Sequence, residues 1–126
     1  MRAVDTNVVL RVLTRDDPRQ AAAADDFIRD GAWVSHMVLV EVTWALHAVY
    51  ELPPARIADA VGMLLDHESL ALEDAAVVVA ALARFRVHPA VGFADCLILE
   101  VARRAGHGSL GTFDRRFAKV AGTEPL

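Results

Sequence analysis

The sequence predicts an α/β fold, a three-layer α/β/α sandwich with a short, mostly parallel sheet of about five strands. Short apolar runs alternate with longer helical patterns, which indicates strand–helix–strand units and a parallel sheet covered on both faces. The chain has 23 alanines and only 6% aromatic residues, a composition that favours helices over a β-sandwich. Its 126 residues are enough for one ordinary domain, so we expect a single domain over residues 1–126.

The strands are predicted from short apolar runs that lie between helical segments. All of them are very short, so the helices dominate the fold. They are expected at Ala3–Val4, Ala32–Ser35, Ser69–Leu72 and Ser109–Thr112, with a last short strand that includes Thr123 and Glu124.

The helices are predicted from apolar periodicity and from start and stop signals. Asp17-Pro18 is a helix start, with Asp at the N-cap and Pro at the first helical position. The pair Pro53-Pro54 breaks the chain, and Gly106 closes a later helix. The expected helices are Asn7–Thr14, Pro18 to about Asp30, Met37–Tyr50, Ala55–His67, Asp74 to about Arg86, Ala94–Ala105 and a short Arg115–Val120.

Charge and cysteine content exclude several classes of protein. The formal charge of −4 argues against a histone-like nucleic-acid binder, and Cys96 is the only cysteine, which excludes an internal disulfide and a cysteine zinc cluster. The longest purely apolar run, Ala75–Ala83, is far shorter than the roughly 20 residues of a membrane span. The N-terminus lacks the pattern of a signal peptide. We therefore expect a soluble, cytoplasmic protein with no membrane partner.

Four carboxylates follow predicted strands or open the helices after them. Asp5 follows the first strand, Glu41 lies early in the helix after the second, Asp95 opens a late helix, and Asp114 follows the fourth strand together with Thr112. Functional sites of open parallel α/β sheets form outside the carboxyl ends of the strands. The sequence therefore predicts one acidic site at one edge of the sheet.

Each of these carboxylates also has a purely structural interpretation. Asp5, Asp95 and Asp114 could each cap the helix that follows. Glu41 lies in the apolar segment Val38–Trp44, whose neighbours suggest burial, so it should either pair with an arginine or bind a cation. Four such coincidences at one edge are less probable than one acidic site.

Four clustered carboxylates repel one another, and divalent cations relieve that repulsion. All-oxygen ligands suit Mg²⁺ or Mn²⁺ rather than zinc. The five histidines show no paired metal spacing and are interpreted as structural or surface residues, although His36 lies close to the second strand end. Such a site suits phosphoryl chemistry.

Four segments of the sequence together resemble the PIN-domain ribonucleases. They are Val4–Leu10, the lone Glu41 in its apolar helix, Phe93–Ile98 and Gly111–Phe117. The resemblance covers the whole chain in order and spacing, and the closest branch is the VapC toxins of bacterial and archaeal toxin–antitoxin pairs.

The resemblance implies a PIN-like fold and Mg²⁺- or Mn²⁺-dependent cleavage of RNA phosphodiester bonds that inhibits translation, with transfer or ribosomal RNA as plausible substrates. It further implies a homodimer and a VapB-type antitoxin that blocks the acidic cleft. By match to the family, the acidic metal-site residues are Asp5, Glu41, Asp95 and Asp114. The supporting polar residues are Thr6, Asn7 and Thr112, of which Thr112 orients the attacking water or holds Asp114.

Basic residues follow the first and last of these motifs. Trp44, on the predicted helix of Glu41, is interpreted as core or interface rather than as a base-stacking platform. Without the four proposed site carboxylates, the rest of the chain carries 13 basic and 13 acidic groups. The excess negative charge of the chain therefore equals the charge of the proposed site, which two divalent cations would neutralise. We therefore expect RNA binding to depend on metal. Arg11, Arg15, Arg115, Arg116 and Lys119 are the candidates for contacts with RNA phosphates.

Two other functions stay open at this point. A phospho-receiver-like regulatory module has a similar doubly wound fold, but it requires an acidic pair after the first strand, where this chain has Asp5 alone. The protein could also act chiefly as a dimeric binding partner with weak cleavage. Antitoxin binding would then survive loss of all four acids.

Overall fold

The five strands are short and divide into two parallel sheets. In the computed structural model, which describes residues 1–126, the larger sheet has the order β1-β2-β3. β4 and β5 form the smaller sheet. The strands are β1 (Arg2–Ala3), β2 (Ala32–Val34), β3 (Leu70–Leu72), β4 (Leu110–Thr112) and β5 (Thr123–Pro125).

Every helix expected from the sequence is present, with boundaries that differ by at most a few residues. The short helix expected over Arg115–Val120 is a single 3-10 turn. The helices are α1 (Thr6–Thr14), α2 (Pro18–Ile28), α3 (His36–Ala48), α4 (Pro54–Asp66), α5 (Ala75–Val87), α6 (Phe93–Arg104) and the 3-10 turn η1 (Phe117–Lys119).

Side-chain caps fix where several helices begin. The Asp17 carboxylate accepts a hydrogen bond from the Gln20 amide at 3.1 Å, and Pro18 follows at the first helical position, as the sequence predicts. Ser35 caps α3 and Asp74 caps α5 in the same way. Because these caps directly follow or closely follow β2 and β3, each helix starts at the carboxyl end of its preceding strand.

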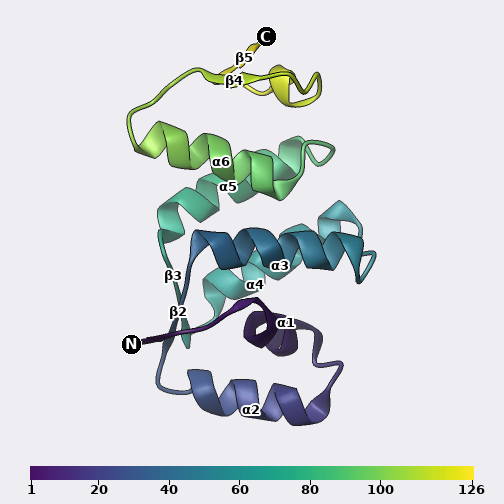
Figure 1. Cartoon of the computed structure of the whole chain (residues 1–126), viewed down its shortest axis with the longest axis vertical. Coiled ribbons are helices and arrows are strands. Elements are labelled where there is room, and N and C mark those ends of the chain that lie inside the picture. Colours follow the sequence, from purple (N-terminus) through teal and green to yellow (C-terminus); the bar gives the residue numbers. More distant parts are fainter.

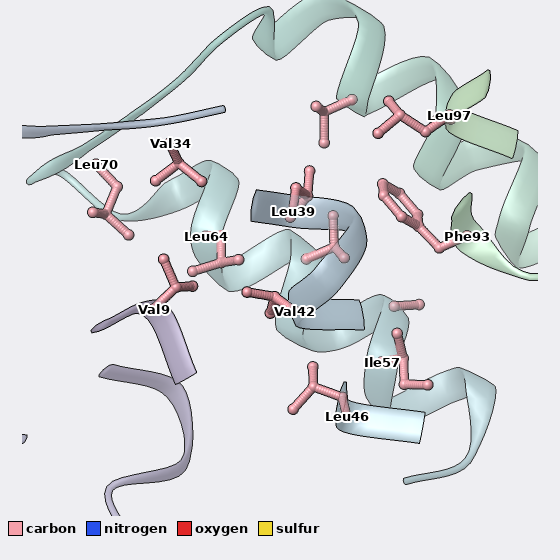
Figure 2. Close-up of a cluster of buried hydrophobic side chains, with 14 of the residues drawn as sticks. Val9, Val34, Leu39, Val42, Leu46, Ile57, Leu64, Leu70, Phe93 and Leu97 are labelled. Carbon is pink, nitrogen blue, oxygen red and sulfur yellow. The ribbon is translucent and has the colours of Figure 1, made fainter. Parts of the chain in front are cut away.

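The main hydrophobic core lies between α3, α4 and the larger sheet. Figure 2 shows Leu39, Val42 and Leu46 of α3 facing Ile57 and Leu64 of α4 within this cluster. The core continues into α6 through Phe93 and Leu97 and contains 22 buried residues. A separate cluster of three buried residues packs α6 against the C-terminal segment: Leu99, Phe117 and Val120.

The smaller sheet lies at the opposite end of the molecule from α2, beyond α6 (Figure 1). The α/β class and the parallel pairing are confirmed, but the five strands do not form the single sheet that we expected, because β1 and β4 are not paired. A strand of two residues offers few backbone groups for pairing. Hydrophobic patterning indicates where strands lie, but it does not indicate which strands pair with one another. None of the helices combines the length and the hydropathy that a membrane-spanning segment requires.

Candidate active site

The end of β1 places Asp5 and Thr6 beside α3. The Asp5 carboxylate accepts a hydrogen bond from the Val8 amide at 3.2 Å and is the N-cap of α1. The next residue, Thr6, donates its hydroxyl proton to Oε2 of Glu41 at 2.9 Å. This bond connects the segment that follows β1 to the early part of α3. The sequence places these two segments near each other because both follow the carboxyl ends of strands.

Glu41 is exposed, which overturns the expectation that its apolar neighbours bury it. It makes no ion pair with an arginine, and Thr6 is its hydrogen-bond partner. Successive helical residues point about 100° apart, so buried neighbours such as Val42 say little about the direction of Glu41. The carboxylate therefore remains available to an external ligand.

Asp95 lies in the first turn of α6 beside Asp114. The N-cap of α6 is Gly92, whose φ of +92° is readily adopted only by glycine, so Asp95 is not the helix cap that one interpretation suggested. Its carboxylate is partly buried and accepts no hydrogen bond from the protein. Burial raises the pKa of Asp95, and the nearby negative charge of Asp114 raises it further.

Asp114 is held in place by the loop that follows β4. Its Oδ1 atom accepts hydrogen bonds from the amides of Arg116 at 2.8 Å and Phe117 at 3.0 Å, so it holds the turn that leads into η1, whose N-cap position is Arg116. Its own amide donates to Oγ1 of Thr112 at 3.0 Å. Thr112 therefore positions Asp114, which is one of the two roles expected for it.

The structure links the acidic residues only in part. Thr6, the residue after Asp5, bonds to Glu41, and the negative charge of Asp114 acts on Asp95. No group of three or more His, Cys, Asp or Glu side chains is close enough together to hold a metal ion. The expectation of one acidic cluster at one sheet edge is not met in this form, because β1 and β4 belong to different sheets.

Glu41 borders two hollows of the surface. It lines a hollow of about 450 Å³ together with Thr6 and Asn7 of α1. It also lines an apolar groove of about 520 Å³ together with Leu97 and Ile98 of α6, the helix that carries Asp95. The Glu41 carboxylate therefore borders one surface formed with α1, which follows Asp5, and another formed with α6, which carries Asp95.

The basic residues proposed for RNA binding fall into two sets, those whose side chains already have partners within the protein and those that do not. Arg11 donates to Gln20 and to Tyr50 and pairs with Asp16 at 3.1 Å, and Arg15 pairs with Asp25. Both guanidinium groups already have partners within the protein. The basic side chains that follow β4 are exposed and make no ion pair, and they are the freer candidates for phosphate contacts: Arg115, Arg116 and Lys119.

Two aromatic residues near Glu41 were not assigned to the site from sequence. Trp44 is 65% exposed, so it is not a core residue. The Tyr50 hydroxyl donates to Oδ2 of Asp16 at 3.0 Å and lines the same hollow as Glu41. The helical spacing of Glu41 and Trp44, three residues apart, places them on one face and was the available signal.

The PIN domain family model matches residues 2–123 of the chain. The match implies a metal-dependent nuclease fold. The chain belongs to the PIN domain family, whose members generally use Mg²⁺ or Mn²⁺ and act on RNA. No curated protein and no solved structure matches the chain.

Proposed function

We propose that this protein is a Mg²⁺- or Mn²⁺-dependent endoribonuclease toxin that hydrolyses RNA phosphodiester bonds and is neutralised by a VapB-type antitoxin. The observation that carries the enzymatic part is the Asp95 carboxylate. It is partly buried and receives no hydrogen bond, and burial together with the negative charge of Asp114 raises its pKa. Such a group is costly without a positive partner, and a divalent cation supplies one.

The donor chemistry of the four acids fits Mg²⁺ or Mn²⁺, since all of the side-chain donors are oxygens. Asp5, Glu41, Asp95 and Asp114 are the proposed ligands. Bound cations of this kind lower the pKa of water and stabilise charge that develops on the leaving oxygen. No three acids lie close enough together to hold one ion by themselves, but Mg²⁺ is commonly bound through one or two carboxylates together with waters and substrate phosphates.

The polar neighbours hold these carboxylates in productive orientations. Thr6 fixes Oε2 of Glu41 through its hydroxyl, and Thr112 fixes the backbone of Asp114. Asn7 makes no side-chain hydrogen bond within the protein and lines the hollow beside Glu41. Support of this kind keeps a ligand carboxylate from rotating away, and its loss commonly reduces metal affinity or activity.

The toxin role rests on the sequence resemblance together with an exposed apolar surface that suits a protein partner. Met37 of α3 is 77% exposed, and Ile98 and Val101 of α6 are 49% and 40% exposed. The three line one apolar groove. We infer that a second copy of the chain or an antitoxin segment covers this groove.

Incubation of purified protein with RNA tests the enzymatic proposal. Cleavage should require Mg²⁺ or Mn²⁺, should stop with EDTA, and should be lost in Asp5→Asn with the fold intact by circular dichroism. Cleavage by Asp5→Asn protein that is free of contaminating nuclease would refute the assigned site. Mapping of cleavage ends in cellular RNA after induction, with wild type beside Asp5→Asn, would identify the substrate.

A further inference from the structure

A hollow beside Glu41 combines an exposed aromatic ring with polar side chains. It lies between α1 and the C-terminal part of α3 and has a volume of about 450 Å³. Thr6 and Glu41 form one part of its wall, and Trp44 and Tyr50 form another. The volume lies within the range of small-molecule sites, which is roughly 300–1,000 Å³. The hollow is therefore lined by one of the proposed catalytic carboxylates, that of Glu41, and is large enough for a nucleoside.

Trp44 presents its indole to solvent in this hollow. The side chain is 65% exposed, although tryptophan is a residue type that is buried on average. It also lines a second hollow with Phe93 and Ala94 of α6, so space adjoins the residue on both the α1 side and the α6 side. An exposed ring with free space beside it is suited to stacking on another planar group.

The hollow that Trp44 lines also contains a fixed phenol and a free amide. The Tyr50 hydroxyl accepts a hydrogen bond from Arg11 at 3.1 Å and donates to Asp16 at 3.0 Å, which fixes the phenol. The Asn7 amide has no hydrogen-bond partner within the protein, so both its oxygen and its nitrogen can meet a ligand. A rigid aromatic wall with one free amide matches the needs of a nucleobase, which has a π-face and a polar edge.

We propose that this hollow binds one base of single-stranded RNA, stacked on the indole of Trp44, next to the phosphodiester that is cleaved. This inference rests on the proposed ribonuclease function and adds a recognition site to it. Stacking on aromatic side chains is tolerant of sequence, because every base has a π-face. The pocket therefore orients an unpaired nucleotide beside Glu41 rather than selecting a long sequence.

The hollow differs from the broad apolar groove of the molecule in its polar groups. Its lining is mainly apolar, with Leu10, Ala45 and Val49 beside the exposed indole, and it also contains the polar side chains of Thr6, Asn7, Arg11 and Glu41. The broad apolar surface of the molecule lies elsewhere, in the groove that contains Met37 and Ile98. A protein partner that buries apolar area would gain more from that groove.

Tryptophan fluorescence tests the proposal directly, since Trp33 and Trp44 are the only two indoles. The reporter protein carries Trp33→Phe, which leaves Trp44 as the only indole, and Asp5→Asn, which prevents cleavage. The probes are hexaadenylate RNA and an abasic ribose-phosphate oligomer of the same length, each titrated in Mg²⁺. We expect hexaadenylate to quench Trp44 emission and the abasic oligomer to leave it unchanged.

Substitution at Trp44 provides the second measurement. In the Asp5→Asn background, Trp44→Leu should weaken hexaadenylate binding by about 5- to 150-fold by anisotropy, whereas Trp44→Phe retains part of the affinity. Trp33→Leu is the matched control, because Trp33 lies on β2 and lines neither hollow beside α3. In otherwise wild-type enzyme, Trp44→Leu should raise KM more than it lowers kcat.

The outcomes separate this inference from the proposed function. If wild type cleaves RNA but hexaadenylate binds without quenching Trp44, or Trp44→Leu binds as tightly as its parent, the base site is wrong and the ribonuclease stands. If no RNA is cleaved in Mg²⁺ or Mn²⁺, the proposed ribonuclease function fails. The comparison of Trp44 quenching by hexaadenylate and by the abasic oligomer then still shows whether the hollow binds a base. If Trp44→Leu retains RNA binding and instead converts a dimer to a monomer in sedimentation, the ring belongs to a protein interface and the proposal is overturned.

Discussion

The hydroxyl of Thr6 donates a 2.9 Å hydrogen bond to Oε2 of Glu41, a residue 35 positions later in the sequence. The bond fixes a carboxylate on α3 relative to the end of β1, where Asp5 lies. Because Glu41 is exposed and has no other side-chain partner, its orientation depends on Thr6.

The first prediction follows from this bond. Thr6→Val keeps the shape of the side chain and removes the donor, so metal affinity or kcat should fall by about 10-fold. The free energy of unfolding should change by only about 0.5 kcal/mol, since the site is open to solvent. Thr6→Ser should retain most of the activity. Equal activity of Thr6→Val and wild type would show that Glu41 needs no support.

The second prediction concerns the pH dependence of stability. The pKa of Asp95 is raised by burial and by Asp114, whereas the pKa of Asp25 is lowered by its hydrogen bond to Arg15. Between the ordinary and the raised pKa of Asp95, the folded state binds more protons than the unfolded state, so this group contributes stability that is lost as pH rises. Asp25 contributes with the opposite sign, and its stability is lost as pH falls.

Urea unfolding across acid and neutral pH checks this difference. Asp95→Asn should be more stable than wild type at neutral pH, and its advantage should disappear at pH values below the ordinary pKa of an aspartate, about 3.9. Asp25→Asn should be less stable than wild type at neutral pH. A loss of stability in Asp95→Asn at neutral pH would show that its charge has a favourable partner in the folded protein.

The third prediction is that Mn²⁺ stabilises the fold through the four carboxylates. A ligand that binds the folded state alone stabilises it by about 2.7 kcal/mol at 100 times its Kd, which raises Tm by several degrees. The shift should disappear in Asp95→Asn and in Asp114→Asn. It should persist in Asp66→Asn, whose carboxylate is exposed at the end of α4. A shift of equal size in all three variants would place the cation elsewhere.

The helices were predictable because their signals are local. Asp17 and Pro18 set the start of α2 whatever the rest of the chain does, and Pro53 and Pro54 separate α3 from α4 in the same way. The pairing of β1 with β2 rather than with β4 depends instead on how the helices pack. A strand as short as Arg2–Ala3 holds too little pattern to specify its neighbours.

The positions of the candidate residues could be inferred from the sequence only in part. Asp5 and Asp114 follow strands as expected, yet the burial inferred for Glu41 was wrong because apolar neighbours on a helix face other directions. The proximity of Asp95 to Asp114 depends on packing of α6 against the C-terminal segment, through Leu99 in particular. Contacts between distant segments of this kind have no local sequence signal.

The fourth prediction concerns the ion pair between Arg84 of α5 and Glu100 of α6. The two side chains are only 23% and 12% exposed, and Nη1 of Arg84 also donates to the carbonyl oxygen of Ala121 at 3.2 Å. Arg84→Met leaves Glu100 largely buried without its partner and should cost about 2–3 kcal/mol of unfolding free energy. The double variant Arg84→Met/Glu100→Leu should recover much of this loss. If the double variant loses the full sum of both single changes, the two residues do not act as a pair.

The fifth prediction uses Cys96, which follows Asp95 in α6. Its side chain is fully buried, and burial together with the nearby charge of Asp95 raises the pKa of the thiol to about 11. The native protein should therefore react with Ellman's reagent at pH 8 only as α6 opens, whereas guanidinium-unfolded protein should release one equivalent of thiolate at once. Leu99→Ala, which leaves a cavity beside the C-terminal segment, should speed the native reaction. Mn²⁺ should slow the reaction of the native thiol if binding at Asp95 keeps α6 packed. Rapid stoichiometric labelling of the native wild type would show that α6 is not packed as described.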